Sequence, residues 1–226
     1  MSRGNDIVVA IDGPSASGKS TVAREAARRL GFVYVDSGMY YRAMTWKALR
    51  EGVAPTDAPA VEALMLRCRW ETDLVDGAVR LRLDGMCPSS DLRSAAVREN
   101  VSEVAAQPAV RRFIVARLRE TLAYGPLVME GRDIGSVVFP NAPFKFYLDA
   151  DPNERARRRA HDIAHLEGRA DEREVLESLE RRDQRDRTRR EAPLQIALGA
   201  VVIDTTRMSV DEVADEIVRR VRAGTA

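Results

Sequence analysis

One short segment, Gly13-Pro-Ser-Ala-Ser-Gly-Lys-Ser20, constrains the fold more than any other part of the sequence. Its spacing, G-x-x-x-x-G-K-S, is typical of a turn that wraps around phosphate groups. A short β-branched run precedes it at residues 7–11, and apolar residues recur at helical spacing over residues 19–30. Backbone N–H groups and the positive end of a helix both attract anions. A strand, this turn and a helix in sequence therefore predict a phosphate-binding loop, rather than a glycine-rich turn with a chance lysine.

The predicted loop is suited to a nucleoside triphosphate with Mg²⁺. Lys19 would supply a point charge to the outer phosphates, and Ser20 would offer Mg²⁺ a hydroxyl oxygen. The residues predicted to contact the triphosphate are Gly13, Pro14, Ser15, Ala16, Ser17, Gly18, Lys19, Ser20 and Thr21. The loop alone does not distinguish a kinase from a GTPase-like switch or a motor. The sequence has no N-K-x-D guanine-reading segment, which disfavours a GTPase.

Further short apolar runs alternate with helical or loop-like stretches along the chain. They occur at residues 32–35, 127–130, 144–148 and 200–203. Together with residues 7–11, these runs predict an α/β fold with a doubly wound parallel sheet of about five strands and helices on both faces.

Two stretches depart from this alternation. Residues 78–84 alternate apolar with charged side chains, which predicts a small antiparallel sheet at about residues 66–90. Residues 155–190 are crowded with arginine and acidic residues and predict two charged helices joined near Gly168. Asp151, followed by a proline and then a glutamate, marks where the first of these helices begins.

The composition excludes several classes of protein. Of the 226 residues, 45% are hydrophobic and 31% are charged, as in ordinary folded proteins. No apolar run approaches the roughly 20 residues of a membrane span, so no membrane partner is expected. A net charge of +1 provides no overall field to attract nucleic acid, and no nucleic-acid partner is expected. Cys68 and Cys87 are too few for a disulfide framework, which favours a reduced, cytoplasmic setting.

A second group of charged residues is suited to bind an acceptor anion beside the triphosphate. Arg42 follows the second predicted strand, and Arg132 and Asp133 follow the strand at residues 127–130. Ligands of parallel sheets bind beyond the carboxyl ends of the strands, so these charges favour a ligand site. The arginines of residues 181–189 alternate with acidic residues, which by itself indicates a solvated helix.

Four segments, in this order, resemble bacterial cytidylate kinases. They are the loop at residues 13–20, Asp36-Ser-Gly-x-x-Tyr-Arg42, Gly131-Arg-Asp-x-Gly-x-Val-Val-Phe-Pro140 and Arg182-Asp-x-Arg-Asp-Arg-x-Arg189. The resemblance spans nearly the whole chain, and its last three segments are more specific than a phosphate loop. It implies an enzyme that transfers the γ-phosphoryl group of ATP to CMP or dCMP, giving ADP and CDP or dCDP, with Mg²⁺ as cofactor.

The resemblance also implies roles for individual residues. The CMP phosphate would be bound by Arg42, Arg132 and Arg189, the cytosine by Ser37, Ser102, Arg111 and Asp133, and the sugar by Arg182 and Asp186. The side chains acting on the transferred group would be Lys19, Arg132, Arg158, Arg159 and Arg189. Mg²⁺ would be held by Ser20, with Thr21 as the alternative, and through water by Asp36.

Asp133 is the residue that we expect to read the base. A carboxylate can accept a hydrogen bond from the N4 amino group of cytosine, whereas uracil presents a carbonyl oxygen at the same position. Two acceptors would then face each other, so the sequence predicts a preference for CMP over UMP.

We expect one kinase domain over residues 1–226, acting as a monomer. Its core would comprise residues 1–37, 112–153 and 192–226, with a monophosphate-binding insertion at residues 38–111 and an arginine-rich helical lid at residues 154–191. Two alternatives stay open. One is a phosphate-loop kinase of another small acceptor, such as UMP. The other is a non-catalytic nucleotide-sensing or RNA-binding module that uses the charged helices as its contact.

Overall fold

The structure is a computed structural model that describes residues 7–88 and 91–225. Within these residues, a seven-stranded sheet has the order β3-β4-β2-β5-β1-β6-β7. The strands are β1 (Val8–Asp12), β2 (Val33–Asp36), β3 (Trp70–Val75), β4 (Ala78–Leu83), β5 (Leu127–Gly131), β6 (Phe144–Asp149) and β7 (Val201–Asp204). Strands β2, β5, β1, β6 and β7 run parallel, and they coincide closely with the short apolar runs of the sequence.

The antiparallel pair β3–β4 belongs to the central sheet, which corrects the expectation of a separate small sheet at residues 66–90. The two strands pair along their whole length. β4 then joins β2 through one parallel pair, Tyr34 with Ala78. The N–H group of Tyr34 also donates to the carbonyl of Gly77 over 2.9 Å. An alternating pattern predicts a strand but does not show which sheet edge the strand joins. With β3 and β4 added to the five parallel strands, the described sheet has seven strands.

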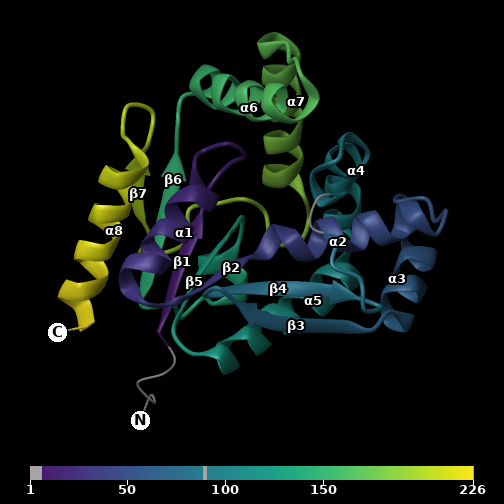
Figure 1. Cartoon of the computed structure of the whole chain (residues 1–226), viewed down its shortest axis with the longest axis horizontal. Coiled ribbons are helices and arrows are strands. Elements are labelled where there is room, and N and C mark those ends of the chain that lie inside the picture. The colour runs from purple at the N-terminus through teal and green to yellow at the C-terminus, as the bar shows by residue number, and fades with distance from the viewer. Residues whose placement is uncertain (1–6, 89–90, 226) are drawn as a thin grey trace.

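Helices cover both faces of the sheet (Figure 1). The α-helices of the described residues are α1 (Lys19–Leu30), α2 (Ser37–Arg50), α3 (Ala58–Arg67), α4 (Ala95–Ala106), α5 (Pro108–Glu120), α6 (Pro152–Glu167), α7 (Glu172–Thr188) and α8 (Val210–Thr225). Short helical turns occur at η1 (Asp91–Arg93), η2 (Thr121–Tyr124) and η3 (Ile134–Val138). No helix in the described part of the chain combines the length and the apolar character of a membrane span.

Alternate residues of the central strand β1 serve two separate cores. Val8 and Ala10 pack in the core that includes helices α2 to α5, whereas Val9 and Ile11 pack with α1 and α8. All four are buried. Because the strand is covered on both faces, it is continuously apolar rather than alternating with polar residues. The rigid sheet that results fixes the positions of the loops at its carboxyl edge.

Helices α6 and α7 pack against each other beyond that carboxyl edge (Figure 1). Asp151 caps α6 by accepting the N–H of Asn153 over 2.8 Å, as the capping pattern predicts. A small core of Ala156, Ala160, Val175 and Leu179 holds the two helices together. Charged side chains of the pair, such as Arg155 and Asp183, contact the phosphate loop. The pair therefore covers this edge of the sheet with polar groups.

Candidate active site

A cleft of about 1040 Å³ opens between the phosphate loop and helices α2, α4, α6 and α7. Among the predicted site residues, Gly13 and Pro14 do not line it. Gly13 instead lies against β6, where a Cβ would be 2.1 Å from the carbonyl oxygen of Leu148. The predicted residues along the cleft are Ser15, Ala16, Ser17, Gly18, Lys19, Ser20, Thr21, Asp36, Ser37, Arg42, Ser102, Arg111, Arg132, Asp133, Arg158, Arg159, Arg182, Asp186 and Arg189.

The phosphate loop is held in shape by its own side chains and by residues from outside the loop. The Ser17 hydroxyl donates to the carbonyl of Pro14 over 3.2 Å. The Lys19 ammonium donates to the same carbonyl and to Ser17 Oγ, the latter over 3.3 Å. Thr205, after β7, donates to the carbonyl of Ser17 over 3.1 Å. Burial and, to a smaller extent, the cation of Arg132 lower the pKa of Lys19 to about 7. Lys19 of the loop and Arg132 after β5 are therefore two mutually repelling cations beside a space where an anion can lie.

Two residues of the α6–α7 pair, Arg155 and Asp183, hold the loop at Ser15. The Ser15 N–H donates to Asp183 Oδ1 over 3.2 Å. Arg155 Nη1 donates to the Ser15 carbonyl over 3.1 Å and to Asp183 Oδ2 over 2.5 Å. Both charged side chains are almost fully buried, with exposures of 6% and 5%. Sequence reasoning missed both residues, because mixed charge in a helix indicates solvation and gives no signal of burial against another loop.

The arginines predicted to bind the acceptor converge on the cleft from separate elements. Arg42 lies on α2, Arg132 follows β5, Arg182 lies on α7 and Arg189 follows it. Arg42, Arg182 and Arg189 each have a buried nitrogen with no hydrogen-bond partner in the described chain. Burial, together with the cations of Arg132, Arg42 and Arg159, lowers the pKa of Arg182 to about 10. Buried donors without partners are costly, so this cluster is built to receive an anion.

Asp133 and Asp186 offset part of this positive charge. Arg132 Nε donates to Asp186 Oδ2 over 2.9 Å. Asp133 pairs with Arg111, and its other oxygen lies 3.7 Å from Arg189. Both carboxylates are buried. The cleft thus presents anchored acceptor oxygens beside cationic donors, which is what a ligand with both a phosphate and an amino group requires.

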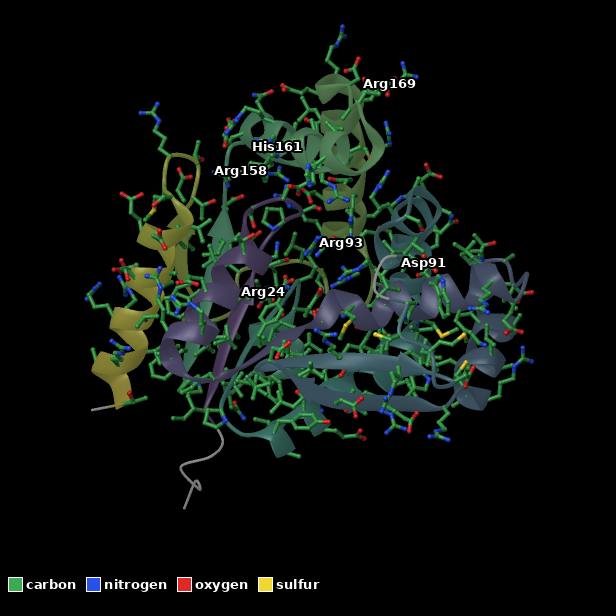
Figure 2. All side chains as sticks on the ribbon, viewed as in Figure 1. Arg24, Asp91, Arg93, Arg158, His161 and Arg169 are labelled. Carbon is green, nitrogen blue, oxygen red and sulfur yellow. The ribbon has the colours of Figure 1, made fainter. Side chains whose placement is uncertain are left out.

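The remaining predicted residues differ in how firmly they are held. Arg158 donates to the carbonyl of Thr205 over 2.7 Å and to Glu154 over 2.9 Å. Among the described residues, Arg159 forms an ion pair with Asp162 alone, at 3.9 Å. Figure 2 shows Arg158 and His161 on the side of α6 that faces the loop, with Arg93 across the same space, and all three line the cleft. Arg159 is therefore freer than Arg158 to reorient toward a ligand.

Ser37 and Ser102 face the cleft from opposite helices. Ser37 begins α2 and is buried, and Ser102 lies on α4. A Cβ on Gly131 would lie 2.5 Å from the Ser37 hydroxyl oxygen. The glycine therefore allows β5 and α2 to approach closely enough for both to reach one ligand.

Oxygen atoms suited to a hard cation meet beside the phosphate loop. The Ser20 hydroxyl donates to Glu130 Oε1 over 2.6 Å. Asp36 lies beside Glu130 in the register of β2 with β5. Burial raises the pKa of Glu130, and the neighbouring Asp36 raises it further, so a cation would relieve the repulsion. A hydroxyl and two carboxylates suit Mg²⁺, which takes few protein ligands and keeps several waters. The sequence predicted Ser20 and Asp36 here but missed Glu130, because it lies within a buried strand.

The fold and this site define an α/β nucleotide kinase with a phosphate-binding loop. The sequence profile described as cytidylate kinase matches residues 9–223. The cytidylate kinase of Pelotomaculum thermopropionicum is 44% identical over 218 residues, covering 96% of each chain. That of Symbiobacterium thermophilum is 43% identical over 218 residues, with the same coverage. The chain belongs to the cytidylate kinase family, which confirms the resemblance seen in its motifs.

A solved structure supports the fold independently of sequence. An uncharacterized protein from Eubacterium ventriosum matches with a TM-score of 0.50 at 12% sequence identity, covering 96% of this chain and 99% of that chain. At such low identity the likeness shows the fold alone.

The Arg155–Asp183 pair yields a stability prediction. Replacing Arg155 with methionine leaves a buried carboxylate without its cation, which should lower the free energy of unfolding by about 3–5 kcal/mol. The double variant Arg155→Met with Asp183→Leu should recover most of that loss, because neither charge is then left unpaired. Urea unfolding of the double-mutant cycle measures both effects. A single variant as stable as the wild type would show that the pair does not hold the helices on the loop.

Proposed function

We propose that the protein transfers the γ-phosphoryl group of ATP to CMP or dCMP, giving ADP and CDP or dCDP. One observation carries the proposal. The lysine of a phosphate loop and several arginines with unpartnered buried nitrogens line the same cleft. Cations on both sides suit a donor and an acceptor that each carry phosphate. The full-length relatives named cytidylate kinase identify CMP as the acceptor.

On the donor side, the loop of residues 13–21 would hold the triphosphate. Its backbone N–H groups and Lys19 would contact the outer phosphates. Mg²⁺ would be held by Ser20 directly and by Asp36 and Glu130 through water, and when bound it would neutralise charge on the phosphates. The short Ser20–Glu130 hydrogen bond and the repulsion between the two carboxylates support this placement.

On the acceptor side, Arg42, Arg132 and Arg189 would bind the phosphate of CMP. The cytosine would lie among Ser37, Ser102, Arg111 and Asp133, and the sugar beside Arg182 and Asp186. The buried nitrogens of Arg42 and Arg189 support the phosphate assignment, because a bound anion would satisfy them. Arg111 and Arg189 flank the carboxylate of Asp133 and would orient it as an acceptor for the N4 amino group.

The reaction needs positioned charge rather than a strong base. Phosphoryl transfer passes through a loose transition state, and the attacking phosphate of CMP is already anionic near neutral pH. Lys19 and Arg132, with Arg189, would stabilise charge on the transferred group. Arg159, which is less firmly paired than Arg158, would approach the group when the helices close over it. Closure would also exclude water that could otherwise hydrolyse ATP.

The larger segments of the chain would have separate roles in this reaction. Residues 38–111 would form the monophosphate-binding insertion, residues 154–191 the lid, and the remaining residues one kinase core. The separate small core of α6 and α7 supports a lid that moves as a unit. The protein would act as a cytoplasmic monomer, and its two free cysteines, Cys68 and Cys87, suit a reduced setting.

Turnover of a panel of nucleoside monophosphates tests the function directly. With ATP and Mg²⁺, CMP and dCMP should be phosphorylated with far higher kcat/KM than UMP, AMP or GMP. Best turnover of UMP would favour a kinase of another acceptor. No turnover with any monophosphate would favour a non-catalytic nucleotide sensor.

Lys19 should be needed for a normal rate of phosphoryl transfer. The change Lys19→Met should lower kcat by about 10²–10³, because one preorganised charge in a site contributes about that much. Lys47→Met is the matched control, since Lys47 is also buried but pairs with Glu51 and Asp84 outside the cleft. Steady-state assays should show near-normal kcat for the control. Near-normal kcat for Lys19→Met would refute the donor site.

Asp133 should control the choice of base. In Asp133→Asn the side chain can donate to the O4 carbonyl of uracil as well as accept, so the ratio of kcat/KM for CMP over UMP should fall by about ten- to a hundredfold. The measurement is the pair of kcat/KM values for each protein. An unchanged ratio, with both values lowered equally, would assign Asp133 a structural role only.

A further inference from the structure

Asp12 is a buried acidic residue to which phosphoryl transfer gives no task. It ends β1 and is 2% exposed. Its two carboxylate oxygens each accept one backbone N–H group over 2.7 Å, Oδ1 from Ile134 and Oδ2 from Gly135. These are the first residues of η3, and Arg132 and Asp133 come directly before them. Asp12 thus binds the backbone beside the acceptor residues while leaving their side chains free.

The strand register ties the same segment to Asp12 a second time. Gly131, at the end of β5, is the parallel partner of Asp12 in β1. The segment from Gly131 to Gly135 is therefore an arch with both ends attached to one residue. Sheet pairing holds the first end, and the carboxylate holds the second. Arg132 and Asp133 form the top of this arch and line the cleft.

We propose that Asp12 is a positioning residue for the acceptor, which orients Arg132 and Asp133 by holding both ends of the arch. The inference rests on the proposed function, since it assumes that these two residues bind CMP. Asp12 also directly precedes Gly13, the first residue of the phosphate loop. One residue thereby sets the spacing between the donor loop and the acceptor arch, and in-line transfer depends on that spacing.

The packing around the second hydrogen bond shows how closely the arch approaches the carboxylate. A Cβ on Gly135 would lie 3.3 Å from Asp12 Oδ2 and equally close to Lys145 Cδ and Ala197 Cβ. At that distance the arch or these side chains would have to shift by a few tenths of an ångström. Glycine at this position therefore allows the hydrogen bond to form at normal length.

Burying the charged carboxylate of Asp12 costs free energy, which disfavours this residue as a purely structural cap. Burial raises the pKa of Asp12 to about 7, although the two N–H groups and Lys19 act in the opposite direction. Asp133 adds to the rise by repulsion. An apolar residue would avoid this cost but would leave two buried N–H groups unpaired. The carboxylate satisfies both groups at once, with one oxygen for each.

The change Asp12→Asn tests the proposal. The amide keeps the size of the side chain but has one acceptor oxygen, so one N–H of the arch loses its partner. We expect kcat/KM for CMP to fall by about ten- to a hundredfold, as for loss of a hydrogen bond to a charged group. KM for ATP should stay unchanged, because the phosphate loop is held separately by Arg155, Asp183 and Thr205.

Two further variants separate an effect on positioning from a general loss of stability. Ile217→Val, on α8 and fully buried, is a control for a general loss of stability remote from the cleft. Gly135→Ala leaves Asp12 intact but displaces the arch, and it should show the same selective loss for CMP. It replaces Asp12→Asn in the test should that variant fail to fold.

The wild-type assay separates the two proposals. A wild type that does not phosphorylate CMP would refute the proposed function. An active wild type with wild-type CMP constants in the folded variants would overturn the role of Asp12. So would parallel losses for CMP and ATP that match those of Ile217→Val.

Discussion

The parallel register of β1, β5 and β2 is the constraint on which the whole site depends. It sets Asp12 beside Gly131 and Asp36 beside Glu130, so three loops leave the sheet at the same level. Hydrogen bonds between residues far apart in the chain follow from this register. Ser20 reaches Glu130, and Asp12 reaches the start of η3. A shift of one residue in β5 would turn the Glu130 side chain to the opposite face of the sheet, away from Ser20.

The buried cations at the carboxyl edge of the sheet repel one another, which lowers the stability of the unliganded protein and favours the binding of an anion. Lys19, Arg132 and Arg182 lie close enough for burial and mutual repulsion to depress the pKa of Lys19 and of Arg182. Asp186 offsets part of the repulsion through its ion pair with Arg132, and the charge of Asp183 raises the pKa of Lys19. Among the buried nitrogens without a hydrogen-bond partner in the described residues, those of Arg42, Arg182 and Arg189 lie on predicted acceptor residues. The free energy lost by burying these donors is recovered when an anion binds, which couples binding to the assembly of the cleft.

Much of the fold and site could be predicted from the sequence, because local patterns carried the signal. The β-branched runs marked the parallel strands, and the glycines and Lys19 marked the loop. Strand-end motifs placed Arg42 and Arg132 at one edge, since strand ends of a parallel sheet meet there, and the family resemblance placed Arg189 with them. The edge joined by the β3–β4 hairpin could not be predicted, because that choice depends on a single pairing between Tyr34 and Ala78.

Other residues escaped prediction because their roles depend on tertiary contacts. Arg155 and Asp183 look like solvated helix residues until the α6–α7 pair is placed on the loop. Asp12 is the last residue of β1 and Glu130 the second last of β5, and nothing local distinguishes a buried carboxylate with a distant partner from an ordinary strand end. The hydrogen-bond partners of Asp183, Glu130 and Asp12 in the other loop all lie more than a hundred positions away in the chain.

The central claim is that one cleft binds the donor and the acceptor together. Inhibition by adenosine and cytidine joined through five phosphates tests it most directly, because this molecule spans both sites at once. The account predicts one tight site per chain and competition with both ATP and CMP, with far higher affinity than either substrate. Competition with only one of the two substrates, or binding at two independent sites, would contradict it.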